Sequence, residues 1–154
     1  MERCVSVRLR VAQLLIFVAT LLTAHASAEG LAVVLVTDKD SPIENISSLD
    51  IRKVYFGISV SIEGQAIRAL RRRDDERLNQ VFLQSVIAMS QRSYERRLLS
   101  LVLKFGTPRP VEVKTRDGLL KLLAENPSAI AYMWKSDAEA EPRVKIVKVL
   151  WQET

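Results

Sequence analysis

Six consecutive charged residues form the part of this sequence best suited to chemistry: Arg71–Arg73 are followed directly by Asp74–Glu76. Guanidinium groups bind oxyanions through charge-assisted and often bidentate hydrogen bonds, so these arginines could hold a small anion. Alternatively, they could form a solvated charged corner in which they pair with the three carboxylates. We favour the charged corner, because opposite charges this close in sequence can neutralise each other.

Other candidate positions lie at the ends of apolar segments. Thr37 and Asp38 follow an apolar, β-branched run, and strand ends are common ligand positions in open α/β sheets. Simple turn formation explains the same two residues equally well. Trp134 and Trp151 favour packing over a role as a ligand platform. Four further arginines predict a basic surface, with contact to a partner or membrane as the less favoured interpretation: Arg92, Arg96, Arg97 and Arg109.

Cysteine and histidine are nearly absent. The only cysteine is Cys4 and the only histidine is His25, both close to the N-terminus. If that segment is removed, no thiol, imidazole or disulfide remains, and no Cys or His metal ligand either. Most hydrolytic centres are thereby excluded, although a Ser–Lys or carboxylate-only site stays open. We therefore expect a binding protein without metal or cofactor, and not an enzyme.

The N-terminus has the three parts of a secretory signal peptide, which we assign to residues 1–28. Basic residues precede the apolar stretch Val11–Thr23, and Ala26–Ala28 is an A-x-A cleavage site. The apolar stretch is short for a membrane span, although a retained anchor is the alternative. Cleavage would leave residues 29–154 as one periplasmic domain, with 20 basic against 17 acidic residues. This mild charge, together with export, argues against nucleic acid as a partner.

The first half of residues 29–154 predicts a strand, a helix and a two-stranded hairpin. Leu31–Thr37 reads as a buried strand, and the S-x-x-D spacing of Ser47–Asp50 predicts the start of a helix that ends before Gly57. Alternation over residues 58–62 predicts a strand, and a turn at residues 63–65 returns the chain along a second strand, 66–70.

The second half predicts three helices and two strands. An acidic cluster opens a helix that continues through Met89, and Ser90 opens another, with Phe105 on its apolar face and Gly106 at its end. Thr115 or Asp117 caps a helix that ends at residues 126–127. Strands are expected over 129–134 and 144–150, and the apolar face of the last strand switches midway, which indicates a bulge or an edge position. Alternating strands and helices predict an α/β domain.

Taken together, these landmarks resemble the periplasmic-binding-protein-like domain of phosphate ABC transporter substrate-binding proteins. No single landmark is specific, but their order and spacing cover nearly all of residues 30–150. The landmarks are the strand LAVVLVT with a following Ser-Pro loop, LDIRKVYFG at Leu49–Gly57, the turn at Glu63–Gln65, the charged segment Arg72–Phe82, Phe105-Gly106 before Pro108, and PSAIAY at Pro127–Tyr132.

This resemblance implies an α/β fold, namely a single lobe of a type II periplasmic-binding-protein-like fold, with a mixed sheet flanked by helices. Full-length members of the family have two lobes that close on an anion, and this chain has the length of one. The resemblance implies binding of phosphate or another small anion for uptake through an ABC permease. The alternative is a periplasmic interaction or sensory module that engages a periplasmic or inner-membrane protein and has lost phosphate binding.

The match departs from the family at the phosphate loop. Arg72 and Asp74 occupy the family's Arg and Asp positions, but Glu76, Arg77 and Leu78 stand where the family has Ser-Gly-Thr. Glu76 brings a negative charge to the place of the anion, and a leucine side chain cannot donate a hydrogen bond. The candidate ligand-binding residues are Thr37, Asp38, Arg72, Arg73, Asp74, Glu76 and Arg77.

Overall fold

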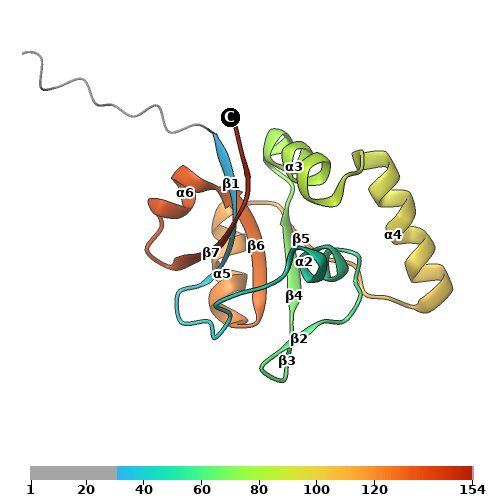
Figure 1. Ribbon diagram of the computed structural model, residues 1–154, viewed down its shortest axis with the longest axis horizontal. Helices are drawn as coiled ribbons and strands as arrows, with labels where there is room; N and C mark the ends of the chain where they lie inside the picture. Colours follow the sequence, from blue (N-terminus) through green and yellow to red (C-terminus); the bar gives the residue numbers. More distant parts are fainter. Residues whose placement is uncertain (1–30, 154) are drawn as a thin grey trace, which may run out of the picture.

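The computed structural model describes residues 31–153, and the expected signal peptide lies outside them. Their centre is one five-stranded sheet in the order β5-β4-β6-β1-β7 (Figure 1). The strands β4, β5 and β6 are mutually parallel, whereas β1 runs antiparallel to both of its neighbours, β6 and β7. The strand bounds are β1 Ala32–Asp38, β4 Arg68–Arg72, β5 Val111–Val113, β6 Ala129–Trp134 and β7 Val144–Gln152. The sheet is therefore mixed, as predicted.

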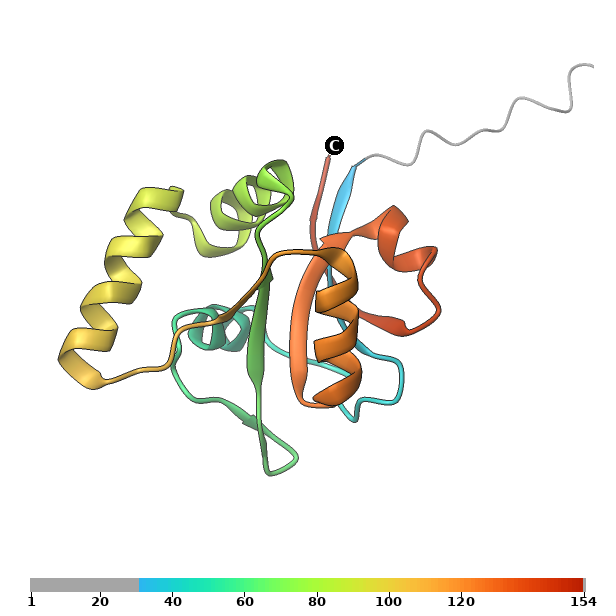
Figure 2. The same cartoon turned by 180° about the vertical axis from the view of Figure 1, so that it is seen from behind.

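Helices cover both faces of this sheet, and the alternation of side chains along β1 explains why. Val33 and Leu35 point into one core and Val34 and Val36 into another, so every residue of this strand is buried. The first core is closed by α2 (Ser48–Tyr55), α3 (Glu76–Phe82) and α4 (Gln91–Phe105). The second core is closed by α5 (Arg116–Glu125) and α6 (Lys135–Glu139), and α5 lies in front of the sheet in Figure 2.

The helix ends follow the capping residues closely. Ser47 accepts a hydrogen bond from the backbone of Asp50 and starts α2, as predicted. Gly57 follows its end with a φ of 74°. Ser90 caps α4, Gly106 ends it in the left-handed conformation, and Thr115 caps α5. These boundaries were predicted because the chemistry of a cap is local.

The segment from residue 58 to residue 72 differs from its prediction. Only β2 (Ser61–Ile62) and β3 (Gln65–Ala66) form the hairpin, around a turn with positive φ at residues 63 and 64. The chain then enters the main sheet as β4, which continues through Arg72, beyond the expected end at Leu70. Residues 68–70, which were predicted to belong to a local hairpin, instead pair with distant strands in the main sheet.

Two helical predictions also need correction. The helix opened by the acidic cluster is α-helical only to the end of α3, continues as a π-helical turn (Leu83–Ile87), and stops at Ala88, whose φ is 61°. The expected apolar face of α4 holds for Tyr94 and Leu98, but Phe105 is 73% exposed. The reason is visible in Figure 1, where the far end of α4 stands away from the rest of the molecule.

The C-terminal strand confirms the predicted irregularity. β7 is an edge strand, and its pairing with β1 shifts register twice, between Val33 and Val34 and between Leu35 and Val36. Trp134 and Trp151 are partly buried against the first core, so the packing interpretation is confirmed. The short strand β5 and the short helix α6 were not predicted. Within residues 31–153, no helix is long and apolar enough to cross a membrane.

Candidate functional site

The sheet separates the candidate residues into two groups at opposite ends. Thr37 and Asp38 end β1 beside the beginning of β6, where the Thr37 Oγ1 donates to the carbonyl of Ala129 at 3.0 Å. The residue paired with Ala129 on β4 is Arg68, at the start of that strand. Arg72 lies at the other end of β4. The antiparallel direction of β1 therefore keeps Thr37 and Asp38 away from the charged run, and Asp38 instead accepts from the backbone of its own turn.

Burial of the first two arginines overturns the solvated corner that we favoured. Arg71 and Arg72 lie within β4 and are 2% and 7% exposed, whereas Arg73 is exposed. The pairing part of that interpretation is confirmed for one residue. The Arg72 Nε lies 2.6 Å from Asp74 Oδ1, and its Nη2 donates to Asp75 Oδ2 at 3.3 Å. A buried guanidinium needs such partners, because an unpaired buried charge is strongly destabilising.

Asp75 holds the end of β4, the start of α3 and the end of β6 together. Its Oδ1 accepts from the backbone N–H of Leu78 at 2.9 Å, which caps α3. Its Oδ2 accepts from the indole Nε1 of Trp134 at 2.9 Å and from Arg72. The first turn of α3 is thus supplied with a carboxylate by its own chain, and an external anion has no free place there.

Arg71 links the sheet to α4. Its Nη1 donates to Glu95 Oε1 at 2.8 Å, its Nη2 donates to Gln91 Oε1 at 2.5 Å, and its guanidinium lies 5.1 Å from the centre of the Tyr94 ring. Burial is the largest single influence and by itself lowers the pKa of Arg71, but the hydrogen bond with Glu95 and the interactions with Tyr132 and Tyr94 together outweigh it, so the net pKa is raised. The Glu95 carboxylate also accepts from Arg109 in the segment after α4. These contacts hold α4 beside β4.

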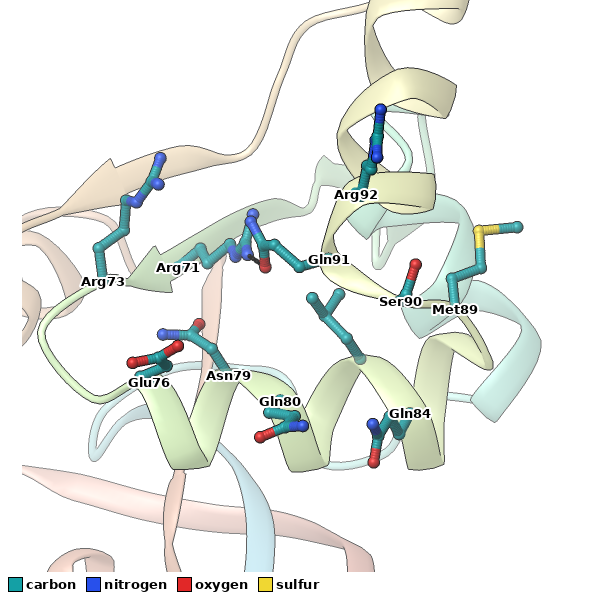
Figure 3. Close-up of a pocket in the computed structure, with 11 residues that line it drawn as sticks. Arg71, Arg73, Glu76, Asn79, Gln80, Gln84, Met89, Ser90, Gln91 and Arg92 are labelled. Atoms are coloured by element: carbon teal, nitrogen blue, oxygen red, sulfur yellow. Dashed lines mark hydrogen bonds between the residues drawn. The ribbon is translucent and has the colours of Figure 1, made fainter.

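A cavity of about 530 Å³ lies between the end of β4, α3 with its π-helical turn, and the start of α4 (Figure 3). Its charged lining residues are Arg71, Arg73, Arg92 and Glu76, and the amide side chains of Asn79, Gln80, Gln84 and Gln91 also line it. The lining is therefore cationic on balance and rich in hydrogen-bonding groups. Arg73 Nη1 already binds both carboxylate oxygens of Glu112, at 3.0 and 2.8 Å.

The wall behind this cavity is a closed polar network. Asn79 donates through Nδ2 to the carbonyl of Asp75 at 2.7 Å and accepts from the hydroxyl of Tyr132. Burial raises the pKa of the Tyr132 hydroxyl, and so it stays protonated and keeps donating at neutral pH. Tyr132 stacks on Phe82 with 3.8 Å between ring centres. Asn79 is therefore fixed toward the wall.

The structure brings only part of the predicted site together. Arg73 and Glu76 line the cavity, whereas Arg72 and Asp74 are paired with each other outside it. The guanidinium of Arg77 lies 6.0 Å from the centre of the Trp134 ring. Arg71, which the sequence analysis considered for anion binding but did not include among the candidate ligand-binding residues, also lines the cavity, and the segment that opens α4 was missed. The one available signal was the polar segment Ser90-Gln91-Arg92, which caps and begins an amphipathic helix. Among residues 31–153, no group of three acidic or other metal-ligating side chains could hold a metal ion.

Comparisons with known proteins place the fold. No protein-family model matches the sequence, and no curated protein matches it. Solved structures do match, among them the following three. An ABC-type phosphate transport receptor from Vibrio cholerae matches with a TM-score of 0.55 and 15% identity over 77% of this chain and 46% of its own. A protein from Clostridium perfringens, assigned as a phosphate ABC transporter substrate-binding protein and solved with bound phosphate, matches with a TM-score of 0.57 and 19% identity over 78% of this chain and 45% of its own. PstS from Borrelia burgdorferi matches with a TM-score of 0.57 and 14% identity over 83% of this chain and 51% of its own.

These matches define the class of fold. The mixed sheet flanked by helices is that of a periplasmic-binding-protein-like α/β domain, as the sequence landmarks implied. The chain spans about half the length of the solved structures that it matches. With sequence identities of 14–19%, these matches establish the fold alone, and the ligand must be argued from the residues of this chain.

Proposed function

We propose that this chain is an exported, solute-binding-like domain that takes a small oxyanion such as phosphate or sulfate into the cavity between β4, α3 and α4. The observation that carries the proposal is the lining of that cavity, which includes three arginines and one acidic residue, Glu76. Charge-assisted hydrogen bonds from guanidinium groups are the strongest that a side chain offers to an oxyanion. The similarity to phosphate-binding transport proteins supports the same ligand class.

Within this cavity the residues have different roles. Arg73 is the proposed main ligand, because it is exposed and its bond to Glu112 is an exposed pair that costs little to exchange. Arg71 contributes long-range charge, since its terminal nitrogens are held by Glu95 and Gln91. The amides of Gln80 and Gln84 supply neutral hydrogen bonds, because those of Asn79 and Gln91 are already engaged within the protein. Of the other candidates, Arg72, Asp74 and Arg77 hold the end of the sheet in place.

Transport is the process that this proposal serves. A domain that binds an anion outside the cytoplasm and resembles ABC transport receptors would deliver the anion to an ABC permease. The proposal therefore includes cleavage after residue 28 and a periplasmic location. Recovery of the protein from a periplasmic extract, with an intact mass that corresponds to residues 29–154, is the expected result. A mass that includes the first 28 residues would refute the cleavage.

Isothermal titration calorimetry of the exported protein with phosphate and with sulfate tests the binding. We expect saturable heat that is lost in Arg73→Gln and retained in Arg77→Gln. The second variant is a matched control, since it removes the same charge from a nearby residue that does not line the cavity. Absence of heat and of a thermal shift at millimolar anion would overturn the proposed function. Equal losses in both variants would refute the assignment to this cavity.

A further inference from the structure

The outward side of α4 carries apolar and basic side chains in one stripe. Arg92, Arg96, Leu99 and Leu103 recur at intervals of four, three and four residues, which places them on one face of a helix. Leu99 and Leu103 are 52% and 76% exposed. We call this stripe, with the adjoining Arg97 and Lys104, the α4 outer face. The opposite side of the helix is buried through Tyr94, Leu98 and Leu101.

Charge on the α4 outer face has one sign. The only acidic residue of α4 is Glu95, and it is turned toward the body of the molecule, where it binds Arg71 and Arg109. Within residues 31–153, none of the four basic side chains of the outer face forms an ion pair. By contrast, the arginines at the end of β4 and after α4 all have carboxylate partners, namely Arg71, Arg72, Arg73 and Arg109. The cations on the outer face are thus available to an external anionic surface.

The shape of this region also restricts what can cover it. Both views show α4 as a rod that projects from the sheet, and its far end carries the exposed Phe105 (Figures 1 and 2). A stable protein–protein interface buries about 800 Å² on each side and is centred on side chains that fill pockets. The α4 outer face is a convex ridge one helix wide. A second copy of the chain would bring the same cations against each other.

We propose that the α4 outer face docks on an anionic lipid surface. A lipid surface needs no groove, and its negative charge complements the four unpaired cations. The leucines would enter the boundary between headgroups and acyl chains, while the neighbouring arginine and lysine stems extend over apolar surface and keep their charges in the headgroup layer. Arg92 belongs to both the cavity lining and the α4 outer face, but Arg96, Leu103 and Lys104 do not line the cavity, so variants at these three positions test the docking separately from anion binding.

Co-sedimentation of the exported protein with lipid vesicles tests the proposal. We expect binding to phosphatidylcholine vesicles that contain about a third phosphatidylglycerol, and none to pure phosphatidylcholine. Binding should disappear near 1 M salt, where the screening length falls to about 3 Å. The double variant Arg96→Gln/Lys104→Gln should weaken partitioning roughly 25-fold, which is about fivefold for each cation near an anionic surface. Leu103→Ser should weaken it several-fold without changing the net charge.

The matched control removes two cations elsewhere. Lys114 and Lys121 lie before and within α5, on the other side of the sheet, and Lys114→Gln/Lys121→Gln has the same net charge as the α4 double variant. It should bind within about twofold of the parent protein. Equal losses in the two double variants would overturn the proposal in favour of unspecific attraction. Failure to bind anionic vesicles would overturn it as well, and so would a dimer in sedimentation equilibrium that Leu103→Ser dissociates.

Discussion

The charge of Glu76 provides the sharpest test of the anion site, because removing it should strengthen binding. Glu76 is exposed and lines the cavity together with Arg71 and Arg73. Among the described residues that line this cavity, it is the only one with a carboxylate. Replacing it by glutamine keeps the shape and hydrogen-bonding capacity of the side chain and removes its repulsion of a bound anion. We therefore expect Glu76→Gln to lower the dissociation constant for phosphate and sulfate.

The size of the gain follows from Coulomb's law. For a separation of about 6 Å, two unit charges repel by ~0.7 kcal/mol at a dielectric constant of 80 and by ~2.8 kcal/mol at 20. The exposure of Glu76 favours the aqueous value. That value corresponds to about threefold for a monoanion and about tenfold for a dianion such as sulfate. Salt screens the repulsion over ~10 Å at 0.1 M, so the gain should shrink as ionic strength rises.

The stability of the same variant should change in the opposite direction. Glu76 lies in the first turn of α3, where a negative charge stabilises a helix by about 0.3–1 kcal/mol. Without ligand, Glu76→Gln should therefore melt a few degrees lower than the parent, while its thermal shift on adding sulfate should be larger.

The assay pairs calorimetry with thermal melts, and Glu44→Gln serves as the control. Glu44 is an exposed residue of the loop between β1 and α2, and its replacement changes the net charge equally. Its affinity for sulfate should stay within about twofold of the parent. If Glu76→Gln binds sulfate no more tightly than Glu44→Gln at low salt, the anion does not lie beside Glu76, and the reasoning fails.

Two further predictions concern the fold that supports the site. A side chain at Gly57 would place its Cβ 1.9 Å from the carbonyl oxygen of Pro108, whereas nothing lies within 4 Å at Gly106, and both residues have positive φ. By urea unfolding, Gly106→Ala should cost about 1–2 kcal/mol and Gly57→Ala clearly more, and equal costs would contradict the close approach. The second prediction is that the three tyrosines of the sequence, which are 0–1% exposed, ionise only on unfolding. Burial raises the pKa of each hydroxyl above 10, so their contribution to stability is present below pH 10 and is lost as the pH rises further. Phenolate absorbance and circular dichroism should change together in an alkaline titration, and gradual ionisation near pH 10 in the folded protein would count against it.

Local signals in the sequence were sufficient for most of the element boundaries. Ser47, Ser90 and Thr115 were identifiable as caps because a cap depends on hydrogen bonds within one turn of the chain. The buried strands β1 and β6 were identifiable from their continuous apolar runs. The strand β5 was missed because three residues carry no periodic pattern. The exposure of Phe105 was missed because periodicity gives the face of a helix but not how far the core extends along it.

The site was harder to predict because its geometry is set by pairing between distant segments. Nothing local in β1 reveals that it runs antiparallel to β6, and that direction separates Thr37 from Arg72. A run of three arginines looks solvated in a sequence, yet Arg71 is buried because Glu95 and Gln91 reach it from a helix 20 or more residues away. Buried arginines of this kind become recognisable only after their partners are placed.

The internal pairing at the end of β4 also limits what the site can do. Arg72 is paired with Asp74 and Asp75, and Arg71 is paired with Glu95. These residues cannot reorganise around a ligand without leaving a buried guanidinium unpaired. Arg73 is different, because its partner Glu112 is also exposed and an exposed pair contributes at most about 1 kcal/mol. An entering anion must replace Glu112 at this guanidinium. Binding should therefore be modest in strength and sensitive to salt, and Glu112→Gln, which leaves Arg73 without that competitor, should strengthen it.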